Sequence, residues 1–400
     1  MTSPNFEMIE EAREVLKGVI SLTPIFKATK LQDNLYIKME NLQRTGSFKI
    51  RGAYNKIAHL TPEECSRGVI TASAGNHAQG VALSASSQGI PSFICIPSVA
   101  PLSKIEATRK LGGEVIIVDG TFDDAQKKSF AIQKERHLTY IHPYDDPYVI
   151  AGQGTIGLEI LEQLPDVDMI VVPVGGGGLV AGIALAVKTL RPEIQIIGVE
   201  AENIAPAYQS WATHKRVSVD SADTLADGIA VKQLGKITYQ IIEQYVDQMV
   251  TVSEADIQDA ILSLLEEIKV IGEGSGATTI AAVLNQYIDT ENKKVCAVLS
   301  GGNINVNTVG KIIQEGLYRT GRLAEYTIQV DDKPGELVKM LSVFQKHGAN
   351  VLSIYQYHNH ELTGLYGMVV RVKIETFNEK HRQIITEELR EAGYLPLKLA

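Results

Sequence analysis

The chain has 400 residues and a formal net charge of −9 at pH 7. This length exceeds the size at which a single hydrophobic core usually stops growing, so we expect two or three domains. Hydrophobic residues make up 44% and charged residues 21%, which is typical of a globular protein with a large core. The net negative charge disfavours binding to nucleic acid or to an anionic membrane surface.

The three cysteines, Cys65, Cys95 and Cys296, are widely separated and show neither a disulfide framework nor metal-ligand spacing. We therefore expect a reducing cytoplasm and no metal site. The N-terminus lacks a basic region followed by an apolar core, so no signal peptide is predicted. Residues 169–187 are uncharged and nearly long enough to span a membrane. Pro173 and four consecutive glycines favour a buried strand, a loop and a buried helix instead.

Over roughly the first 310 residues, short apolar runs alternate with helical patterns, which predicts βαβ units and a parallel sheet. The predicted strands are residues 68–71, 91–96, 114–118, 169–174, 195–200 and 295–299, and the predicted helices include residues 76–83 and 103–111.

The pattern changes after Gly321, where we predict a separate small module. Its predicted strands are residues 324–330, 350–357, 365–372 and 395–399, and its predicted helices run to residue 348 and over residues 377–392. Asp331 and Pro334 predict the first helix start, as an acidic cap followed by an early proline. The order β-α-β-β-α-β is that of a ferredoxin-like fold.

Lys49 lies between Phe48 and Ile50. Burial among apolar side chains disfavours the ammonium form of a lysine, and the neutral amine is a nucleophile that can form a Schiff base with a carbonyl cofactor. The alternative is a surface lysine whose stem packs while its head reaches water. The other motifs of the chain decide between these two interpretations.

A run of four glycines, residues 175–178, separates a predicted buried strand from a predicted helix. Backbone N–H groups at such a turn can close around a phosphate. A simple tight turn is one alternative. Another is a dinucleotide fingerprint at Gly176, Gly178 and Ala181, with Glu200 ending the next strand. A Walker motif is excluded because no Lys-Ser or Lys-Thr follows the glycines.

Two further turns follow predicted strands, at residues 73–77 and 300–303. Backbone N–H groups of the first could hold a carboxylate, and the Asn76 amide could donate to a ligand; His77 is either catalytic or structural. Three such turns at strand ends suit a ligand crevice in an open α/β sheet. Residues 273–277 either reach this crevice or simply turn the chain, and Arg51 is expected to form a salt bridge.

Residues 47–53, 73–80, 175–179 and 300–303 together resemble threonine dehydratase (threonine ammonia-lyase), a family of fold-type II pyridoxal-phosphate enzymes related to serine racemase. The resemblance implies an α/β fold with two open twisted subdomains and mostly parallel sheets in residues 1–320, the smaller subdomain at about residues 45–145. Residues 322–400 resemble an ACT domain, a small ferredoxin-like α+β regulatory fold, on the motifs at residues 332–337 and 348–351.

By this resemblance, Lys49 forms a Schiff base with pyridoxal 5'-phosphate and is the catalytic residue. Phe48 packs against the cofactor ring, Asn76 contacts the ring hydroxyl and Ser300 faces the pyridine nitrogen. The residues implied to hold the cofactor phosphate are Gly175, Gly176, Gly177, Gly178 and Leu179. The residues implied to receive the substrate carboxylate are Ser73, Ala74, Gly75, Asn76 and His77.

The resemblance implies β-elimination of L-threonine to 2-oxobutanoate and ammonia, with L-serine as a further substrate. Lys49 would take the α-proton as general base, and the ring would act as electron sink. A neutral partner of the ring nitrogen, Ser300, should favour elimination over transamination. Racemases of the family have a serine where this chain has Ala74. They also have a metal-binding aspartate where this chain has Pro206, which leaves Glu200 a doubtful cation ligand.

Three alternatives stay open at this point. The first is a serine-preferring dehydratase or racemase of the same family, and the second a nicotinamide oxidoreductase built on the Gly176 turn. The third is a non-catalytic amino-acid sensor built on residues 322–400. The family implies a homotetramer or homodimer and an allosteric amino acid such as isoleucine or valine.

Overall fold

The computed structural model describes residues 3–358 and 367–399. The internal contacts of the chain divide it into two compact units, Met1–Ile304 (unit 1) and Asn305–Ala400 (unit 2). This division assigns helix α13 (Val306–Arg319) to unit 2, whereas the sequence predicts a catalytic domain that ends at residue 320. The predicted domain boundary stays a prediction. Within the described residues, no helix is both long enough and apolar enough to cross a membrane.

The larger sheet of unit 1 has the strand order β1-β2-β10-β7-β8-β9. Only β1 runs antiparallel to its neighbour; the other pairs are parallel. The strands are β1 (Ile25–Lys27), β2 (Leu35–Met39), β7 (Met169–Pro173), β8 (Gln195–Ala201), β9 (Gln248–Val252) and β10 (Val295–Leu299). Every residue of β7 and β10 is buried, as expected for central strands of a parallel sheet covered on both faces.

Helices and short helical turns surround this sheet. They are α1 (Phe6–Leu16), η1 (Glu40–Leu42), α7 (Pro147–Gln163), α8 (Gly178–Leu190), α9 (Pro206–Thr213), η2 (Asp227–Ile229), α10 (Lys236–Tyr245), α11 (Glu254–Ser263), η3 (Leu264–Ile268) and α12 (Gly274–Leu284). The uncharged segment at residues 169–187 is therefore β7, the glycine turn and most of α8.

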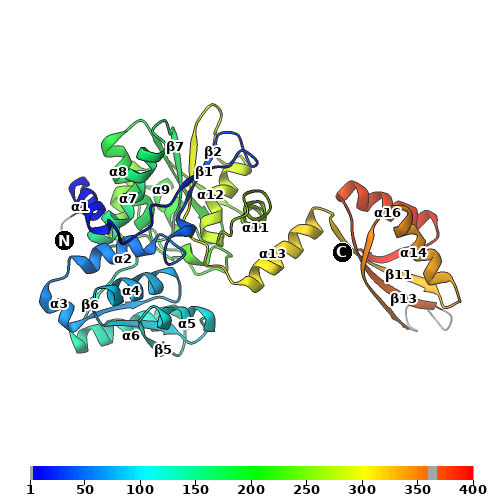
Figure 1. Cartoon of the computed structure of the whole chain (residues 1–400), viewed down its shortest axis with the longest axis horizontal. Coiled ribbons are helices and arrows are strands. Elements are labelled where there is room, and N and C mark those ends of the chain that lie inside the picture. Colours follow the sequence, from blue (N-terminus) through cyan, green and yellow to red (C-terminus); the bar gives the residue numbers. More distant parts are fainter. Residues whose placement is uncertain (1–2, 359–366, 400) are drawn as a thin grey trace. The chain divides into compact units, whose positions relative to one another are not determined.

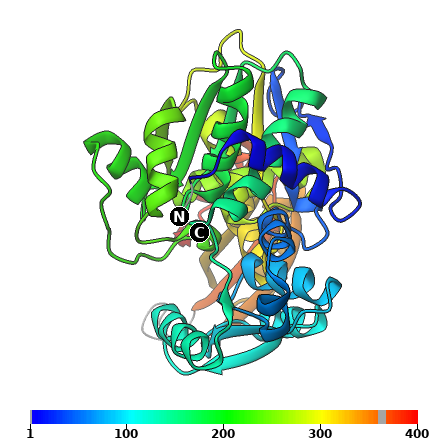
Figure 2. The same ribbon diagram turned by 90° about the vertical axis from the view of Figure 1, so that its left-hand side faces the viewer.

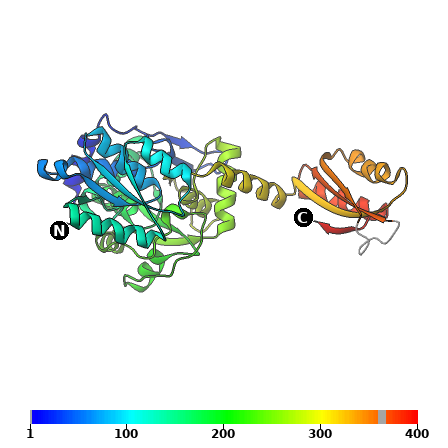
Figure 3. The same ribbon diagram turned by 90° about the horizontal axis from the view of Figure 1, so that it is seen from below.

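A second, all-parallel sheet of unit 1 has the strand order β5-β4-β3-β6. Its strands are β3 (Val69–Ala72), β4 (Ser92–Pro97), β5 (Glu114–Val118) and β6 (Thr139–Tyr140), and its helices are α3 (Pro62–Arg67), α4 (Asn76–Ser87), α5 (Leu102–Lys110) and α6 (Phe122–Arg136). These elements lie together below the larger sheet in Figures 1 and 2 and nearest the viewer in Figure 3.

Helix α2 (Lys49–Ala58) packs against α4 and against α7. Glycines allow the close approach: a Cβ on Gly152 would lie 2.6 Å from the Arg51 carbonyl oxygen, and one on Gly80 would lie 3.2 Å from the Lys49 carbonyl carbon. The first turn of α2, which carries Lys49, is thereby held between two helices from different layers.

Unit 2 contains an antiparallel sheet with the strand order β12-β13-β11-β14. The elements after α13 are β11 (Leu323–Asp331), α14 (Glu336–Lys346), β12 (Asn350–Tyr357), β13 (Gly367–Glu375), α16 (Glu379–Glu391) and β14 (Pro396–Leu399). Helices α14 and α16 cover one face of the sheet (Figure 1), and Phe344 and Leu389 pack there against Tyr326 and Val372. The element order is the ferredoxin-like one that the sequence predicts.

The helix start predicted within residues 331–337 is confirmed at Glu336, but its predicted acidic cap and early proline are wrong. Helix α14 begins at Glu336 after Gly335, whose φ of 92° lies in the left-handed region, whereas Asp331 is the last residue of β11. Pro334 therefore lies in a turn before the helix. The strand β11 ends at Asp331, one residue later than the alternation of apolar and polar residues predicts. Residues 365 and 366 of the predicted strand 365–372 lie outside the described residues.

Candidate active site

The segment before α2 is anchored to the turn that follows β10. The Phe48 backbone N–H donates to the Ser300 carbonyl oxygen at 3.1 Å, and Ser47 forms an antiparallel bridge with Gly301. Ser300 itself is buried. The structure thus brings the predicted lysine and the predicted ring-nitrogen partner into one place.

The Lys49 amine lies in a partly enclosed position. Its Nζ donates to the Pro143 carbonyl oxygen at 3.1 Å and lies 5.1 Å from the centroid of the Phe48 ring. Burial lowers the pKa of Lys49 to about 8, although the Glu273 carboxylate acts in the opposite direction. The neutral, nucleophilic form is therefore far more populated at neutral pH than for an ordinary lysine.

Asn76, the first residue of α4, joins two of the predicted turns. Its Nδ2 donates to Glu273 Oε1 at 2.7 Å, and its Oδ1 accepts from Asn303 Nδ2 at 2.8 Å. The same Asn303 nitrogen donates to the Thr45 carbonyl oxygen at 2.7 Å. Residues 73–77 and 300–303 are consequently neighbours in the structure.

The turn at residues 73–76 is partly exposed, and a Cβ on Gly75 would meet no atom within 4 Å. The Gly75 N–H donates to Ser73 Oγ at 3.2 Å. The open space beside Ser73, Ala74, Gly75 and Asn76 suits a small ligand. His77 is different: it is buried, its Nε2 lies 2.9 Å from the Ile141 carbonyl oxygen, and burial lowers its pKa to about 3. The His77 ring is therefore neutral at physiological pH.

The four-glycine turn is closely enclosed by two other segments. A Cβ on Gly176 would lie 2.2 Å from the Tyr144 ring, and one on Gly175 would lie 2.9 Å from the Ile229 Cα. Gly177 has a φ of 92° and caps α8, so a left-handed conformation is required there. Tyr144 follows Pro143, the residue whose carbonyl oxygen accepts from Lys49. The segment at residues 142–146 thus connects the glycine turn to the lysine.

Two hydroxyl groups beside this crevice, Ser47 Oγ and Ser275 Oγ, are buried without a hydrogen-bond partner among the described residues. These features fit a phosphorylated carbonyl cofactor. The glycine turn at a helix start suits a phosphate, and a lysine of lowered pKa suits a carbonyl group. The two unpaired hydroxyls are free to bind polar atoms of such a cofactor. A family model described as pyridoxal-phosphate dependent enzyme matches residues 16–301. The chain belongs to this family of pyridoxal-phosphate dependent enzymes.

Relatives within the pyridoxal-phosphate dependent enzymes include an L-threonine ammonia-lyase of Thermotoga maritima, which is 48% identical over 97% of this chain and 98% of its own length. Among solved structures, threonine deaminase isoform 2 of Solanum lycopersicum superimposes with a TM-score of 0.74 at 40% identity, covering 78% of this chain and 90% of that chain. Maize serine racemase superimposes with a TM-score of 0.75 at 37% identity, covering 80% and 99% of the two chains.

The carboxylate of Glu200 has a structural role in the described residues and not a ligand-binding one. Its two oxygens accept from the backbone N–H groups of Ala207 and Tyr208, at 3.1 and 2.7 Å, so it caps α9. Burial raises the pKa of Glu200 to about 8, although these two hydrogen bonds oppose the shift. A nicotinamide ribose could not use this occupied carboxylate. Within the described residues, no group of three or more His, Cys, Asp or Glu is placed to hold a metal ion.

Arg51 is the structural residue that the sequence predicts, and it anchors the first turn of α2. Its guanidinium makes a bidentate pair with Glu40 at 2.7 and 2.8 Å and pairs with Glu159 at 2.6 Å. Lys38 Nζ reaches the other Glu159 oxygen at 2.6 Å. Two cations and two carboxylates thus form a charge-balanced network at the first turn of α2. Within this network, Arg51, Glu40 and Lys38 are fully buried.

Sequence reasoning left the role of residues 273–277 open and missed two contributors, the segment at residues 142–146 and η2. Glu273 accepts a hydrogen bond from Asn76, so residues 273–277 do more than turn the chain. The His-Pro-Tyr-Asp-Asp stretch at residues 142–146 carries turn residues between a strand and a helix, a signal that could have drawn attention to it. Nothing in the sequence singles out η2.

We expect Gly176→Ala to disturb the glycine turn, because the added Cβ would overlap the Tyr144 ring. Overpacking of this kind costs about 1–3 kcal/mol, which should appear as weaker pyridoxal-phosphate binding in a fluorescence titration. The control is Gly310→Ala on α13, where a Cβ meets nothing within 4 Å. Gly176→Ala combined with Tyr144→Ala should recover part of the lost affinity. Unchanged binding by Gly176→Ala alone would contradict the role of this turn.

Proposed function

We propose that this chain is a pyridoxal-phosphate dependent threonine ammonia-lyase, which converts L-threonine to 2-oxobutanoate and ammonia and also accepts L-serine. The observation that carries the proposal is the Lys49 amine, which has a pKa lowered to about 8 and donates to the Pro143 carbonyl oxygen. The residues around it contact the turns at residues 73–77, 175–178 and 300–303. The similarity to L-threonine ammonia-lyase over nearly the whole chain supports the same substrate class.

We assign each side chain the task that its position allows. Lys49 Nζ would hold the carbonyl group of the cofactor and, as a neutral base, would take up the α-proton of the substrate. The glycines at 175–178 and the N-terminus of α8 receive the phosphate, together with Leu179. Phe48 packs against the ring, Asn76 reaches its hydroxyl, and Ser300 meets its nitrogen. The bound cofactor supplies the electron sink for the carbanion.

Ala74 bears on the outcome of proton removal. By the resemblance to the racemases, it stands where they have a serine, and it carries only a methyl group. No acid from this position can return a proton to the α-carbon, so elimination of the β-hydroxyl is favoured over racemisation. The neutral His77 ring is not a substitute, because its Nε2 is directed to the Ile141 carbonyl oxygen.

Substrate comparison tests this proposal. The full-length protein with pyridoxal phosphate should form 2-oxobutanoate from L-threonine and pyruvate from L-serine, each with one equivalent of ammonia. Chiral analysis of the L-serine reaction should detect almost no D-serine. Accumulation of D-serine without a 2-oxo acid would replace the proposal by the racemase alternative.

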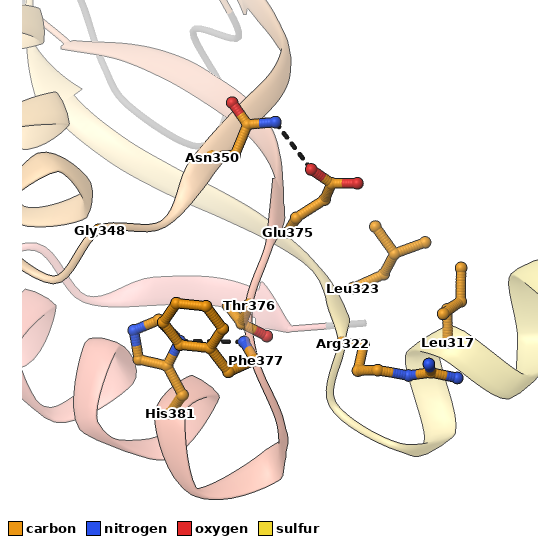
Figure 4. Close-up of a pocket in the computed structure, with 9 residues that line it drawn as sticks. All are labelled: Leu317, Arg322, Leu323, Gly348, Asn350, Glu375, Thr376, Phe377 and His381. Carbon is orange, nitrogen blue, oxygen red and sulfur yellow. Dashed lines mark hydrogen bonds between the residues drawn. The ribbon is translucent and has the colours of Figure 1, made fainter.

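We also propose that unit 2 is an ACT-like regulatory module that binds an amino acid such as isoleucine or valine. A pocket of about 340 Å³ within unit 2 supports this assignment (Figure 4). Its lining includes Arg322 and Glu375, whose carboxylate accepts from Asn350 Nδ2 at 2.7 Å, beside the apolar Leu323 and Phe377. Opposite charges next to an apolar wall are the groups that an α-amino acid with an aliphatic side chain requires.

The edge of the unit 2 sheet supports self-association into a dimer or tetramer. Among the described strands, β12 is an edge strand, and its Leu352, Ile354, Tyr355 and Tyr357 side chains are all exposed. Exposed apolar side chains on an unpaired edge are usually covered by a partner. A second copy of this chain is the partner that we propose.

Regulation is tested by removing the module. A chain ending at residue 321 should keep turnover of L-threonine but lose its response to isoleucine and valine, and Arg322→Ala in the full-length chain should weaken that response. Steady-state kinetics with and without each amino acid provide the measurement. Loss of all function on truncation, with no 2-oxo acid formed by the full chain, would favour the sensor alternative.

A further inference from the structure

Glu273 is a buried carboxylate with no task in the reaction described above. It precedes α12, is 6% exposed, and its backbone N–H donates to the Gly301 carbonyl oxygen at 3.0 Å. A Cβ on Gly301 would lie 2.4 Å from Glu273 Oε1, so the turn after Ser300 leaves room for this carboxylate only because it contains glycine. The side chain is thereby confined between α12 and the turn.

The contact with Asn76 gives this carboxylate a specific consequence. Glu273 Oε1 accepts from Asn76 Nδ2 at 2.7 Å, and Asn76 Oδ1 accepts from Asn303 at 2.8 Å. An acceptor on one side and a donor on the other allow only one orientation of the amide. Glu273 and Asn303 together therefore fix the orientation of the Asn76 amide.

The same carboxylate lies close to the segment that carries Lys49. A Cβ on Gly301 would lie 2.4 Å from Glu273 Oε1 and 3.2 Å from the Cβ of Ser47, two residues before Lys49. The negative charge of Glu273 opposes the effect of burial on the pKa of the Lys49 amine. Burial, followed by the charge of Asp227, raises the pKa of Glu273 to about 7, while the Asn76 hydrogen bond opposes the shift. Two interacting groups with pKa values of about 7 and 8 titrate as a pair. The other charged or titratable groups that act on this pair are Lys104 from α5, Asp227 from η2, His77 from α4 and His142 before α7.

We propose that Glu273 is a positioning residue of this active site, which fixes the Asn76 amide and balances the charge of the Lys49 amine. The inference rests on the proposed function for its consequences in catalysis. Glu273 itself acts through Asn76 and Lys49. Removing the negative charge of Glu273 should therefore change the pKa of Lys49. Removing its hydrogen-bond acceptor should change how tightly the cofactor binds.

Two substitutions separate these properties. Glu273→Gln keeps an oxygen that accepts from Asn76 but removes the charge, whereas Glu273→Ala removes both. The matched control is Glu200→Gln, which neutralises another buried carboxylate that accepts only backbone N–H groups. Circular dichroism of each full-length variant verifies that it is folded.

The decisive readout is the titration of Lys49 in the cofactor-free, full-length protein. The pH dependence of amine modification at Lys49, measured by peptide mass spectrometry, gives its pKa directly. Removing an opposing negative charge should lower this pKa by about one unit in Glu273→Gln. Glu200→Gln should leave it unchanged. Pyridoxal-phosphate affinity should stay near the wild-type value in Glu273→Gln and fall by about tenfold in Glu273→Ala.

An unchanged Lys49 pKa in Glu273→Gln would overturn the inference, and so would an equal shift in Glu200→Gln. A tenfold loss of cofactor affinity in Glu273→Gln would overturn the part concerning Asn76. Because the titration needs neither substrate nor turnover, it is independent of the proposed reaction. Absence of threonine turnover by the wild-type protein would instead contradict the proposed function.

Discussion

Lys49→Ala should lower the rate of 2-oxobutanoate formation from L-threonine by about 10⁴-fold, the upper range for loss of a general acid–base group. The effect is expected to be this large because the same amine holds the cofactor and removes the α-proton. The long-wavelength absorbance of the cofactor bound to the wild-type protein should also disappear. Steady-state kinetics and an absorbance spectrum of the same preparations provide the measurements.

Lys56→Ala is the matched control for this result. Lys56 lies on the same helix, but its Nζ pairs with Asp146 Oδ2 at 3.1 Å, at the start of α7. Its removal should leave turnover within about threefold of wild type, since partly exposed ion pairs contribute little. Full ammonia release by Lys49→Ala would refute the assignment of Lys49.

Arg51→Met should lower the free energy of unfolding of unit 1 by about 3–5 kcal/mol. The substitution leaves the fully buried Glu40 without the cation that is paired with it, whereas Glu159 keeps its ion pair with Lys38. An uncompensated buried charge costs far more than an exposed ion pair contributes. Urea unfolding followed by the fluorescence of Trp211, the single tryptophan of the chain, reports on unit 1 selectively.

The control for Arg51 is Arg13→Met. Arg13 also pairs with a carboxylate, that of Glu162 at 2.7 Å, but both side chains are 51% exposed. Its removal should cost less than about 1 kcal/mol. If the two substitutions cost the same, the buried network does not hold α2 in place, and the argument that it supports Lys49 fails.

Local sequence patterns predicted those strands that are recognisable as runs of apolar residues or of alternating apolar and polar residues. The strands at residues 114–118, 295–299 and 350–357 match β5, β10 and β12 residue for residue, because runs of apolar or alternating residues need no distant partner to be recognised. Strand β2 was missed since Lys38 interrupts its apolar pattern. That lysine is fully buried only because Glu159, far along the chain, neutralises it.

In the active site, too, some features could be predicted from local sequence and others depend on residues far apart in the chain. The three turns and Lys49 carry local signals, and contacts between their segments bring them near one another in the structure. The hydrogen bond between Asn76 and Glu273 joins residues 197 positions apart, and that between Lys49 and Pro143 joins residues 94 positions apart. Only the packing of the two sheets of unit 1 creates such contacts, so the sequence alone could not assign Glu273 or Pro143 to the site.

The central claim, that Lys49 is the cofactor-bearing residue, is tested most directly by borohydride reduction of the full-length protein with pyridoxal phosphate, followed by peptide mass spectrometry. The account predicts one modified lysine, Lys49, at about one cofactor per chain. Attachment of the cofactor to a different lysine, with Lys49 unmodified, would contradict it.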